Sequence, residues 1–181
     1  MAVLESNAIT IVTPCSRPNN LSAMASSIQS GRKLFNLIWM VILDGGEHPN
    51  SVFGNQQRND ALNTITSGWV YFLDDDNLIH PDFFSILLDA IKEQPDVQGF
   101  AFDQIMQNGK IRLLASPNTM HVCHVDMAQV CMRRKLIGDI RFYPSRYESD
   151  GIFIEAIYQS NPKVWKFINK PLCYYNELRE S

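Results

Sequence analysis

Short apolar runs rich in β-forming residues alternate with helical patterns through the first ninety or so residues of the chain. Strands that are separated by helices of about ten residues pair in parallel, and the helices then cover both faces of the sheet. The alternation therefore predicts an α/β fold with a mainly parallel central sheet. The strands are expected at residues 8–13, 37–43 and 68–73, and the helices at residues 20–30, 55–66 and 81–94.

The third predicted strand ends in three consecutive carboxylates, Asp74, Asp75 and Asp76. In an extended backbone, residues two apart point to the same side, so Asp74 and Asp76 are expected to converge while Asp75 faces the opposite side. Carboxylates this close repel one another, and a hard divalent cation, Mn²⁺ or Mg²⁺, allows all of them to ionise. The pattern favours a metal site at Asp74 and Asp76, although a solvated acidic turn has the same local sequence.

Polar residues also mark the ends of the other two predicted strands. Pro14 follows the first strand, and Asp44 ends the second in the turn sequence Asp44-Gly45-Gly46. Open α/β sheets bind their ligands at the carboxyl ends of the strands. Pro14, Asp44 and Asp74 are therefore expected at one ligand-binding edge of the sheet.

The pattern changes in the second half of the chain, which predicts a smaller mixed region. Asn108-Gly109 is typical of a hairpin turn between two strands, and Ser149 or Asp150 is expected to be the N-cap of a helix. The strands are expected at residues 97–102, 111–115, 127–132, 164–168 and 172–175, and the helix at residues 152–159.

Composition narrows the class of protein. The 181 residues, 45% of them hydrophobic, can bury one core, so one domain is expected over 1–181, with halves at 1–95 and 96–181. A net charge of −3 with 16 scattered Lys and Arg argues against a nucleic-acid binder. The four cysteines lack metal-binding spacing, which favours a reducing, cytoplasmic location. The longest apolar run, residues 37–43, is too short for an integral membrane segment.

Several segments, in the right order, resemble the GT-A-fold glycosyltransferases of the family 2 kind. The resemblance is most specific over the first ninety or so residues and implies the GT-A fold, with a nucleotide-sugar-binding half followed by an acceptor half. The matching positions are Thr13-Pro14 and Arg17-Pro18 after the first strand, Asp44 after the second, Arg58-Asn59 and Ala61 in the next helix, Asp74 to Asp76 as an Asp-x-Asp motif, His80-Pro81-Asp82 beyond it, and Glu148-Ser149-Asp150 in the second half.

A nucleotide-sugar donor presents a base, a ribose and a doubly anionic diphosphate. The resemblance implies that Asp44 contacts the base, that Asp74 contacts the ribose, and that a metal ion with Arg58 balances the diphosphate. A turn-forming role for Asp44 and an exposed surface charge for Arg58 are the alternatives. The remaining residues of the implied donor site are Thr13, Pro14, Arg17 and Asp75.

Sugar transfer requires a base that removes a proton from the acceptor hydroxyl. The match at the start of the second-half helix implies that Asp150 is this base. The neighbouring Glu148 could take the role instead, and simple helix capping is the alternative for Asp150.

The sequence therefore predicts a metal-dependent inverting glycosyltransferase that takes a sugar from a nucleoside diphosphate donor, with UDP favoured over GDP. The acceptor is a sugar, a lipid-linked molecule or another small molecule, and a homo-oligomer is left open. One alternative is a sugar-phosphate nucleotidyltransferase, but that class uses a Gly-rich phosphate loop, and residues 14–17 contain no glycine. The other is a catalytically silent module that binds a sugar or a nucleotide.

Overall fold

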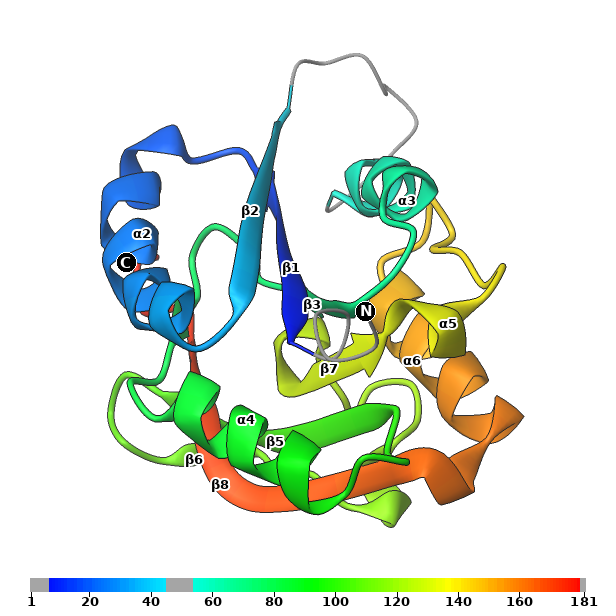
Figure 1. The fold of residues 1–181 in the computed structure, drawn as a ribbon. Helices are drawn as coiled ribbons and strands as arrows, with labels where there is room; N and C mark the ends of the chain where they lie inside the picture. Colours follow the sequence, from blue (N-terminus) through cyan, green and yellow to red (C-terminus); the bar gives the residue numbers. More distant parts are fainter. Residues whose placement is uncertain (1–6, 45–53, 180–181) are drawn as a thin grey trace.

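The computed structural model describes residues 7–44 and 54–179. These residues form one eight-stranded mixed sheet with helices on both faces (Figure 1). Along the sheet the strands are β2 (Asn36–Leu43), β1 (Ala8–Cys15), β3 (Trp69–Phe72), β7 (Val130–Arg133), β5 (Gly99–Met106), β8 (Trp165–Tyr175) and β4 (Leu78–Ile79), and β6 (Ile111–Leu113) pairs with β5 outside this order.

The first three strands along the chain, β1, β2 and β3, pair in parallel, as the alternation predicts. Ile9 of β1 lies opposite Leu37 on one side and Trp69 on the other, so the three carboxyl ends reach the same edge of the sheet. Backbone hydrogen bonds hold this edge together beyond the strands: Asp44 N donates to Cys15 O at 2.8 Å. The edge is therefore a fixed platform for the polar residues that follow each strand.

The second half of the chain completes the same sheet. β7 inserts between β3 and β5 and is antiparallel to both. β5 runs parallel to β8, while β4 and β6 pair antiparallel with β8 and β5 respectively. The two predicted halves therefore share one sheet, and β7 of the second half lies directly beside the strand that carries the acidic cluster.

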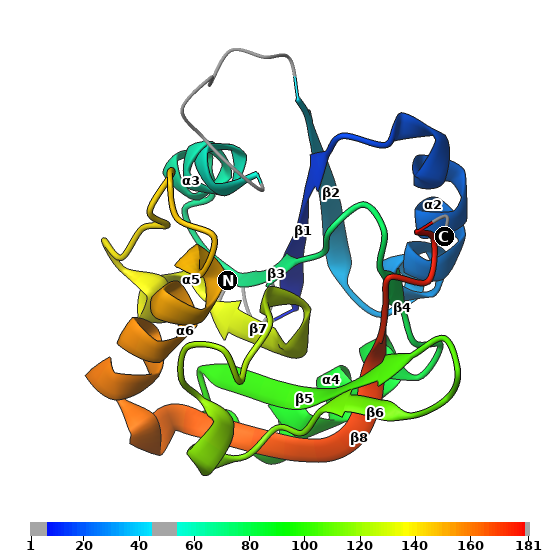
Figure 2. The same ribbon diagram turned by 180° about the vertical axis from the view of Figure 1, so that it is seen from behind.

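Helices cover the two faces of the sheet (Figures 1 and 2). Side chains of α2 and α4 pack against one face, and side chains of α3 and α6 pack against the other. The α-helices are α2 (Leu21–Ile28), α3 (Asn55–Thr64), α4 (Phe83–Glu93), α5 (Arg134–Ile137) and α6 (Ser149–Ser160), and the short 3₁₀ helices are η1 (Pro18–Asn20), η2 (Gln29–Lys33), η3 (Pro117–Thr119), η4 (Met127–Gln129) and η5 (Pro162–Val164).

A hydrophobic core lies on each face of the sheet, and successive residues of β3 point alternately into one core and the other. Trp69 and Tyr71 point into the core under α2 and α4, whereas Val70 and Phe72 point into the core under α3 and α6. All four side chains are fully buried. Burying a large apolar side chain contributes about 1.5–3 kcal/mol, so this strand anchors the acidic cluster that follows it from both faces.

Three local predictions are corrected by the structure. The two closing strands expected in the second half form one strand, β8, because it continues beside β5 through a register shift at Asp103. The strand expected at 127–132 begins with η4, since the Asp126 carboxylate accepts from Ala128 N. Helix α6 begins at Ser149, with Glu148 at the N-cap position, because the Ser149 hydroxyl accepts from the Tyr143 backbone instead.

Among the described residues, no helix has the length and apolar character that crossing a bilayer requires.

Candidate active site

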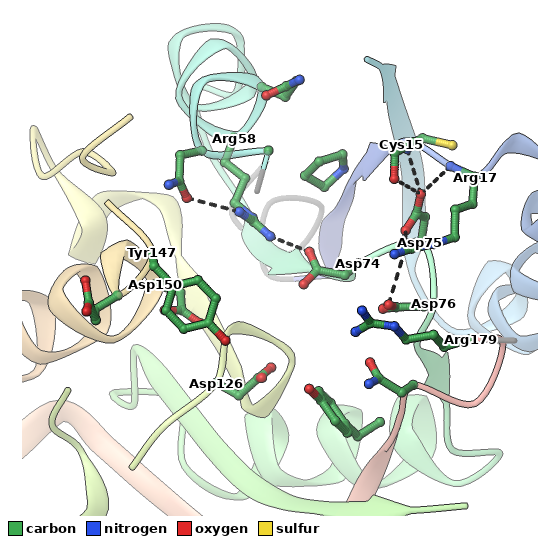
Figure 3. Close-up of a pocket in the computed structure, with 18 of the residues that line it drawn as sticks. Cys15, Arg17, Arg58, Asp74, Asp75, Asp76, Asp126, Tyr147, Asp150 and Arg179 are labelled. Atoms are coloured by element: carbon green, nitrogen blue, oxygen red, sulfur yellow. Dashed lines mark hydrogen bonds and ion pairs between the residues drawn. The ribbon is translucent and has the colours of Figure 1, made fainter. Parts of the chain in front are cut away.

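A cavity of about 700 Å³ opens at the carboxyl ends of β1, β2 and β3. Both halves of the chain line it (Figure 3). Most of the residues predicted for the site meet there: Pro14, Arg17, Asp44, Arg58, Asp74, Asp75, Asp76, Glu148 and Asp150. Thr13 lies behind the cavity, fully buried, where its hydroxyl accepts a hydrogen bond from Trp39 Nε1 at 3.0 Å.

Asp75 connects the turn after β3 to the loop after β1. One carboxylate oxygen accepts from the backbone nitrogens of Ser16 and Arg17, both at 2.6 Å, and the other pairs with the Arg17 guanidinium. The side chain is only 4% exposed. The alternation expected for residues 74–76 does not apply, because β3 ends at Phe72 and the chain turns at Asp75 and Asp76. The Asp75 side chain therefore stabilises the loop after β1.

Arg58 is buried at 4% exposure, so the alternative of an exposed helix charge does not hold. From the first turns of α3 its guanidinium reaches the cavity, where it pairs with the Asp74 carboxylate, and it also donates to Asn55 Oδ1 at 3.3 Å. The Phe142 ring lies 5.5 Å from the guanidinium carbon. Arg58 therefore presents a fixed positive charge beside the acidic cluster.

Asp76 has a weaker partner than its two neighbours. Its carboxylate lies 3.3 Å from Arg17 Nη1, the same nitrogen that pairs with Asp75. Burial, and then the charge of Asp74, raises the pKa of Asp76. Burial also raises the pKa of Asp74, against the opposing effect of Arg58. The raised pKa values favour protonated Asp74 and Asp76 despite the nearby arginines, and a cation would stabilise their ionised forms.

The donor atoms in this cluster fit a hard divalent cation, which prefers carboxylate oxygens. Asp76 is the better placed ligand, since its 3.3 Å contact with Arg17 is longer than the contact by which Arg58 engages one oxygen of Asp74. Within residues 7–44 and 54–179 no group of three or more His, Cys, Asp or Glu is arranged to hold a metal ion. A cation here would therefore draw further ligands from water or from a bound substrate.

The end of β2 and the start of α3 form the wall of the cavity next to this cluster. Asp44 lines the wall, whereas Gly45 and Gly46 of the predicted turn lie outside the described residues. Gly54, the N-cap of α3, has a φ of 72°, and an added Cβ would lie 2.4 Å from Pro14 Cβ. Only glycine permits α3 to approach Pro14 this closely.

Asp150 lies in the first turn of α6, on the opposite wall of the cavity. Burial, and then the negative charge of Asp126, raises the pKa of Asp150 from 3.8 to about 6. Its Oδ1 accepts from Gly151 N at 2.7 Å. A carboxylate with a raised pKa is a stronger base than an ordinary one, so this position suits proton removal. Glu148, two residues earlier in the chain, also lines the cavity.

The sequence did not predict a polar group around Asp126, on the wall of the cavity that the second half of the chain forms. Asp126 accepts hydrogen bonds from Arg112 Nη1 at 2.9 Å, from Gln104 Nε2 at 3.2 Å and from Ala128 N at 3.0 Å. The guanidinium carbon of Arg112 lies over the Tyr175 ring, 3.6 Å from the ring centroid. The Asp126-x-x-Gln129 spacing of a capping box signals the turn, but only the tertiary fold brings it to the cavity. Tyr147 and Arg179 were missed in the same way.

Comparisons with solved structures place the fold among glycosyltransferases. The S. aureus TarS fragment 1-349 in complex with UDP-GlcNAc superposes with a TM-score of 0.61 at 16% identity, over 93% of this chain and 58% of the TarS chain. A mannosyltransferase from Pyrobaculum calidifontis in complex with GDP-Man and Mn²⁺ gives a TM-score of 0.62 at 16% identity, over 94% and 57% of the two chains. This chain therefore spans less than two thirds of either relative.

A glycosyltransferase involved in glycosylation of the major capsid of PBCV-1 is more similar in length, with coverage of 93% and 92%, at 12% identity and a TM-score of 0.50. No curated protein matches the chain in sequence. The model of the family described as "Glycosyl transferase family 2" matches residues 47–170, which is more than half of the chain. The match includes Arg58, Asp74 to Asp76 and Asp150, and the chain belongs to glycosyl transferase family 2.

Proposed function

We propose that the chain is a metal-dependent inverting glycosyltransferase that moves a sugar from a nucleoside diphosphate donor, preferentially a UDP-sugar, to a hydroxyl acceptor. The observation that carries this proposal is the cavity itself, in which the acidic cluster and Arg58 face Asp150 across one space. The relatives bound to UDP-GlcNAc and to GDP-Man support a nucleotide-sugar donor.

The donor would lie along the carboxyl ends of β1, β2 and β3. Asp44, at the end of β2, can accept a hydrogen bond from the imide N–H of uracil, and Asp74 can accept from a ribose hydroxyl. Arg58 and Arg17 supply positive charge near the diphosphate, in a partly enclosed site where such charges act strongly. Pro14 shapes the floor beneath the nucleotide through its contact with Gly54.

Asp76, with the free oxygen of Asp74, would hold Mn²⁺ or Mg²⁺. When bound, such an ion acts as a Lewis acid that balances the charge of the departing nucleoside diphosphate. The Pyrobaculum calidifontis relative in complex with Mn²⁺ supports the use of a divalent metal ion.

Asp150 would act as the base. As the acceptor oxygen forms its bond to the anomeric carbon, the bond from that carbon to the diphosphate oxygen breaks, and the hydroxyl proton passes to the Asp150 carboxylate. The electron pair of the broken bond leaves with the nucleoside diphosphate. A single displacement from the side opposite the leaving group inverts the anomeric carbon. Asp150 suits this role because it is ionised at neutral pH and is more basic than an ordinary carboxylate.

Donor turnover distinguishes this proposal from its alternatives. Purified protein with Mn²⁺ should release UDP from one or more UDP-hexoses, slowly with water and faster with a suitable acceptor. Binding of UDP without release of the nucleoside diphosphate from any UDP-hexose or GDP-hexose would favour a silent binding module. Release of pyrophosphate from a nucleoside triphosphate and a sugar phosphate would favour a nucleotidyltransferase.

Three of the four free cysteines are buried, which is consistent with the proposed cytoplasmic location.

A further inference from the structure

Tyr147 is 72% exposed, although it lines the cavity. It lies on the loop before α6, and in Figure 3 its ring projects into the space between Asp150 and Asp126. An exposed aromatic ring beside the half-buried Asp150 requires an explanation, because aromatic rings usually bury much of their surface in a core or against a ligand.

The loop that carries Tyr147 is braced from two sides. Asn55 of α3 donates through its side-chain nitrogen to the backbone oxygens of Tyr143 at 3.2 Å and Arg146 at 3.0 Å. The Ser149 hydroxyl accepts from Tyr143 N at 2.7 Å. The backbone that leads to Tyr147 is therefore held in place at the cavity wall.

Polar groups with fixed positions lie near this ring. The side chain of Asp126 is held by three donors and is 15% exposed, so it offers acceptor oxygens at a defined place. Arg112, which is held against Tyr175, offers donors beside it. Asp150 follows Tyr147 by three residues and would receive the proton of a hydroxyl that lies near the Tyr147 ring.

This combination distinguishes between classes of acceptor. A sugar ring has an apolar face of C–H groups and a rim of hydroxyls, so it fits an aromatic surface that is flanked by carboxylates and guanidinium groups. A lipid chain requires a continuous apolar wall. Of the described second-half residues that line the cavity, five are charged, and Leu113 and Val125 are the aliphatic ones.

We propose that Tyr147 is the stacking platform of an acceptor subsite and that the acceptor is a saccharide, with Asp126 and Arg112 binding its hydroxyls. This inference rests on the proposed function, because it assigns the acceptor of the same reaction. It adds the chemical class of the acceptor and the residue that holds its ring beside Asp150.

The test uses saturation-transfer NMR on the whole protein with UDP and Mn²⁺, with methyl α- and β-glycosides of glucose, galactose and mannose as probes and octanol as the apolar comparison. Ring protons of at least one glycoside should receive saturation from wild type. Tyr147→Ala should weaken that signal at least fivefold, whereas Tyr147→Phe should retain it, since stacking needs the ring and not the hydroxyl. Tyr143→Ala is the matched control, because Tyr143 is 53% exposed on the same loop and is not among the described residues that line the cavity.

Three outcomes would overturn the proposal: no glycoside signal with wild type, an unchanged signal in Tyr147→Ala, or saturation of octanol alone. UDP affinity, measured by calorimetry, should be the same in Tyr147→Ala as in wild type, which shows that the donor side is intact. Release of UDP from UDP-hexoses tests the proposed function separately. If wild type releases none but the glycoside signal depends on Tyr147, the saccharide subsite stands and the assigned reaction fails.

Discussion

The Asp75 carboxylate accepts a hydrogen bond from the backbone nitrogen of Arg17 at 2.6 Å, which connects the turn after β3 to the loop after β1. Ser16 N donates to the same oxygen. The shape of the floor of the cavity therefore depends on a side chain that reaches the protein's own backbone.

Replacing Asp75 with Ala should destabilise the fold and loosen this loop. Two backbone N–H groups lose a charged acceptor, and hydrogen bonds to charged groups contribute about 1.5–3 kcal/mol. The midpoint of urea unfolding should fall accordingly, and UDP affinity should fall with it. Asp82→Asn is the control, since the Asp82 side chain is 67% exposed, and its unfolding midpoint should stay near that of wild type. Equal midpoints for the two variants would contradict this account.

Asp76→Asn should make UDP binding insensitive to divalent metal. Within the part of the chain that the structure describes, Asp76 has one ion pair, at 3.3 Å, and its pKa is raised, so it is the carboxylate with most to gain from a cation. Calorimetry with and without EDTA should show a clear metal effect for wild type and little for the variant. The metal assignment would be abandoned if wild-type UDP affinity were the same in EDTA.

Asp44→Ala should weaken UDP binding about ten- to a hundredfold, because the lost charge-assisted hydrogen bond contributes about 1.5–3 kcal/mol. Asp44 lines the cavity at the end of β2, where the base is proposed to lie. Calorimetry with UDP and with uridine should show similar losses if the contact is to the base. A loss below threefold, in a variant that still folds, would return Asp44 to a turn-forming role.

Asp150→Asn should reduce transfer by about a hundred- to ten-thousandfold, as expected for loss of a general base. UDP binding should be retained, because Asn is close in shape. The kcat/KM of wild type should rise with pH and level off above about pH 6, because the raised pKa of Asp150 moves the ionisation of its carboxyl group to higher pH. A rate for the variant within tenfold of wild type would exclude Asp150, and Glu148→Gln would then be the variant to measure.

Asp150→Asn, which should lower the transfer rate, should raise the stability of the folded protein at neutral pH. The folded pKa of Asp150 is raised from 3.8 to about 6, so its contribution to stability is full below 3.8 and is lost as the pH rises through about 6. At pH 7 the buried charge therefore destabilises the native state, by up to about 3 kcal/mol. Urea unfolding should show Asp150→Asn more stable than wild type at pH 7 and equal to it near pH 3.5. The exposed Asp89 supplies the control, as Asp89→Asn should show no such pH-dependent gain.

The parallel part of the fold could be predicted from the sequence because local periodicity encodes it. Each strand there is a short apolar run, and each run is followed by a residue that reaches the cavity, as with Asp44 and Asp74. The family resemblance then located Arg58 and Asp150 in the same cavity. Periodicity could not show that Arg58 is buried, because a charged residue in a polar helix normally faces solvent.

The second-half wall could not be predicted, for a physical reason. Asp126 and Tyr147 lie on loops, and their positions depend on pairing between distant strands rather than on local pattern. The contact between Asp75 and the loop after β1 could not be predicted from strand alternation, because alternation holds only while the backbone stays extended, and the chain leaves that conformation after Phe72. Thr13 lies on the same face of β1 as Ile9 and Ile11, where its hydroxyl meets Trp39.

The position of β7 between β3 and β5 affects how the chain can be made in a cell. β3 leaves the ribosome about sixty residues before its partner β7, and translation at about 5–20 residues per second makes that an interval of several seconds. Throughout it, one edge of a strand with four fully buried side chains has no neighbour, and such an edge can pair with other chains. The nascent protein should therefore depend on chaperones during this interval, and slow codons placed between residues 73 and 129 should lower the yield of soluble enzyme.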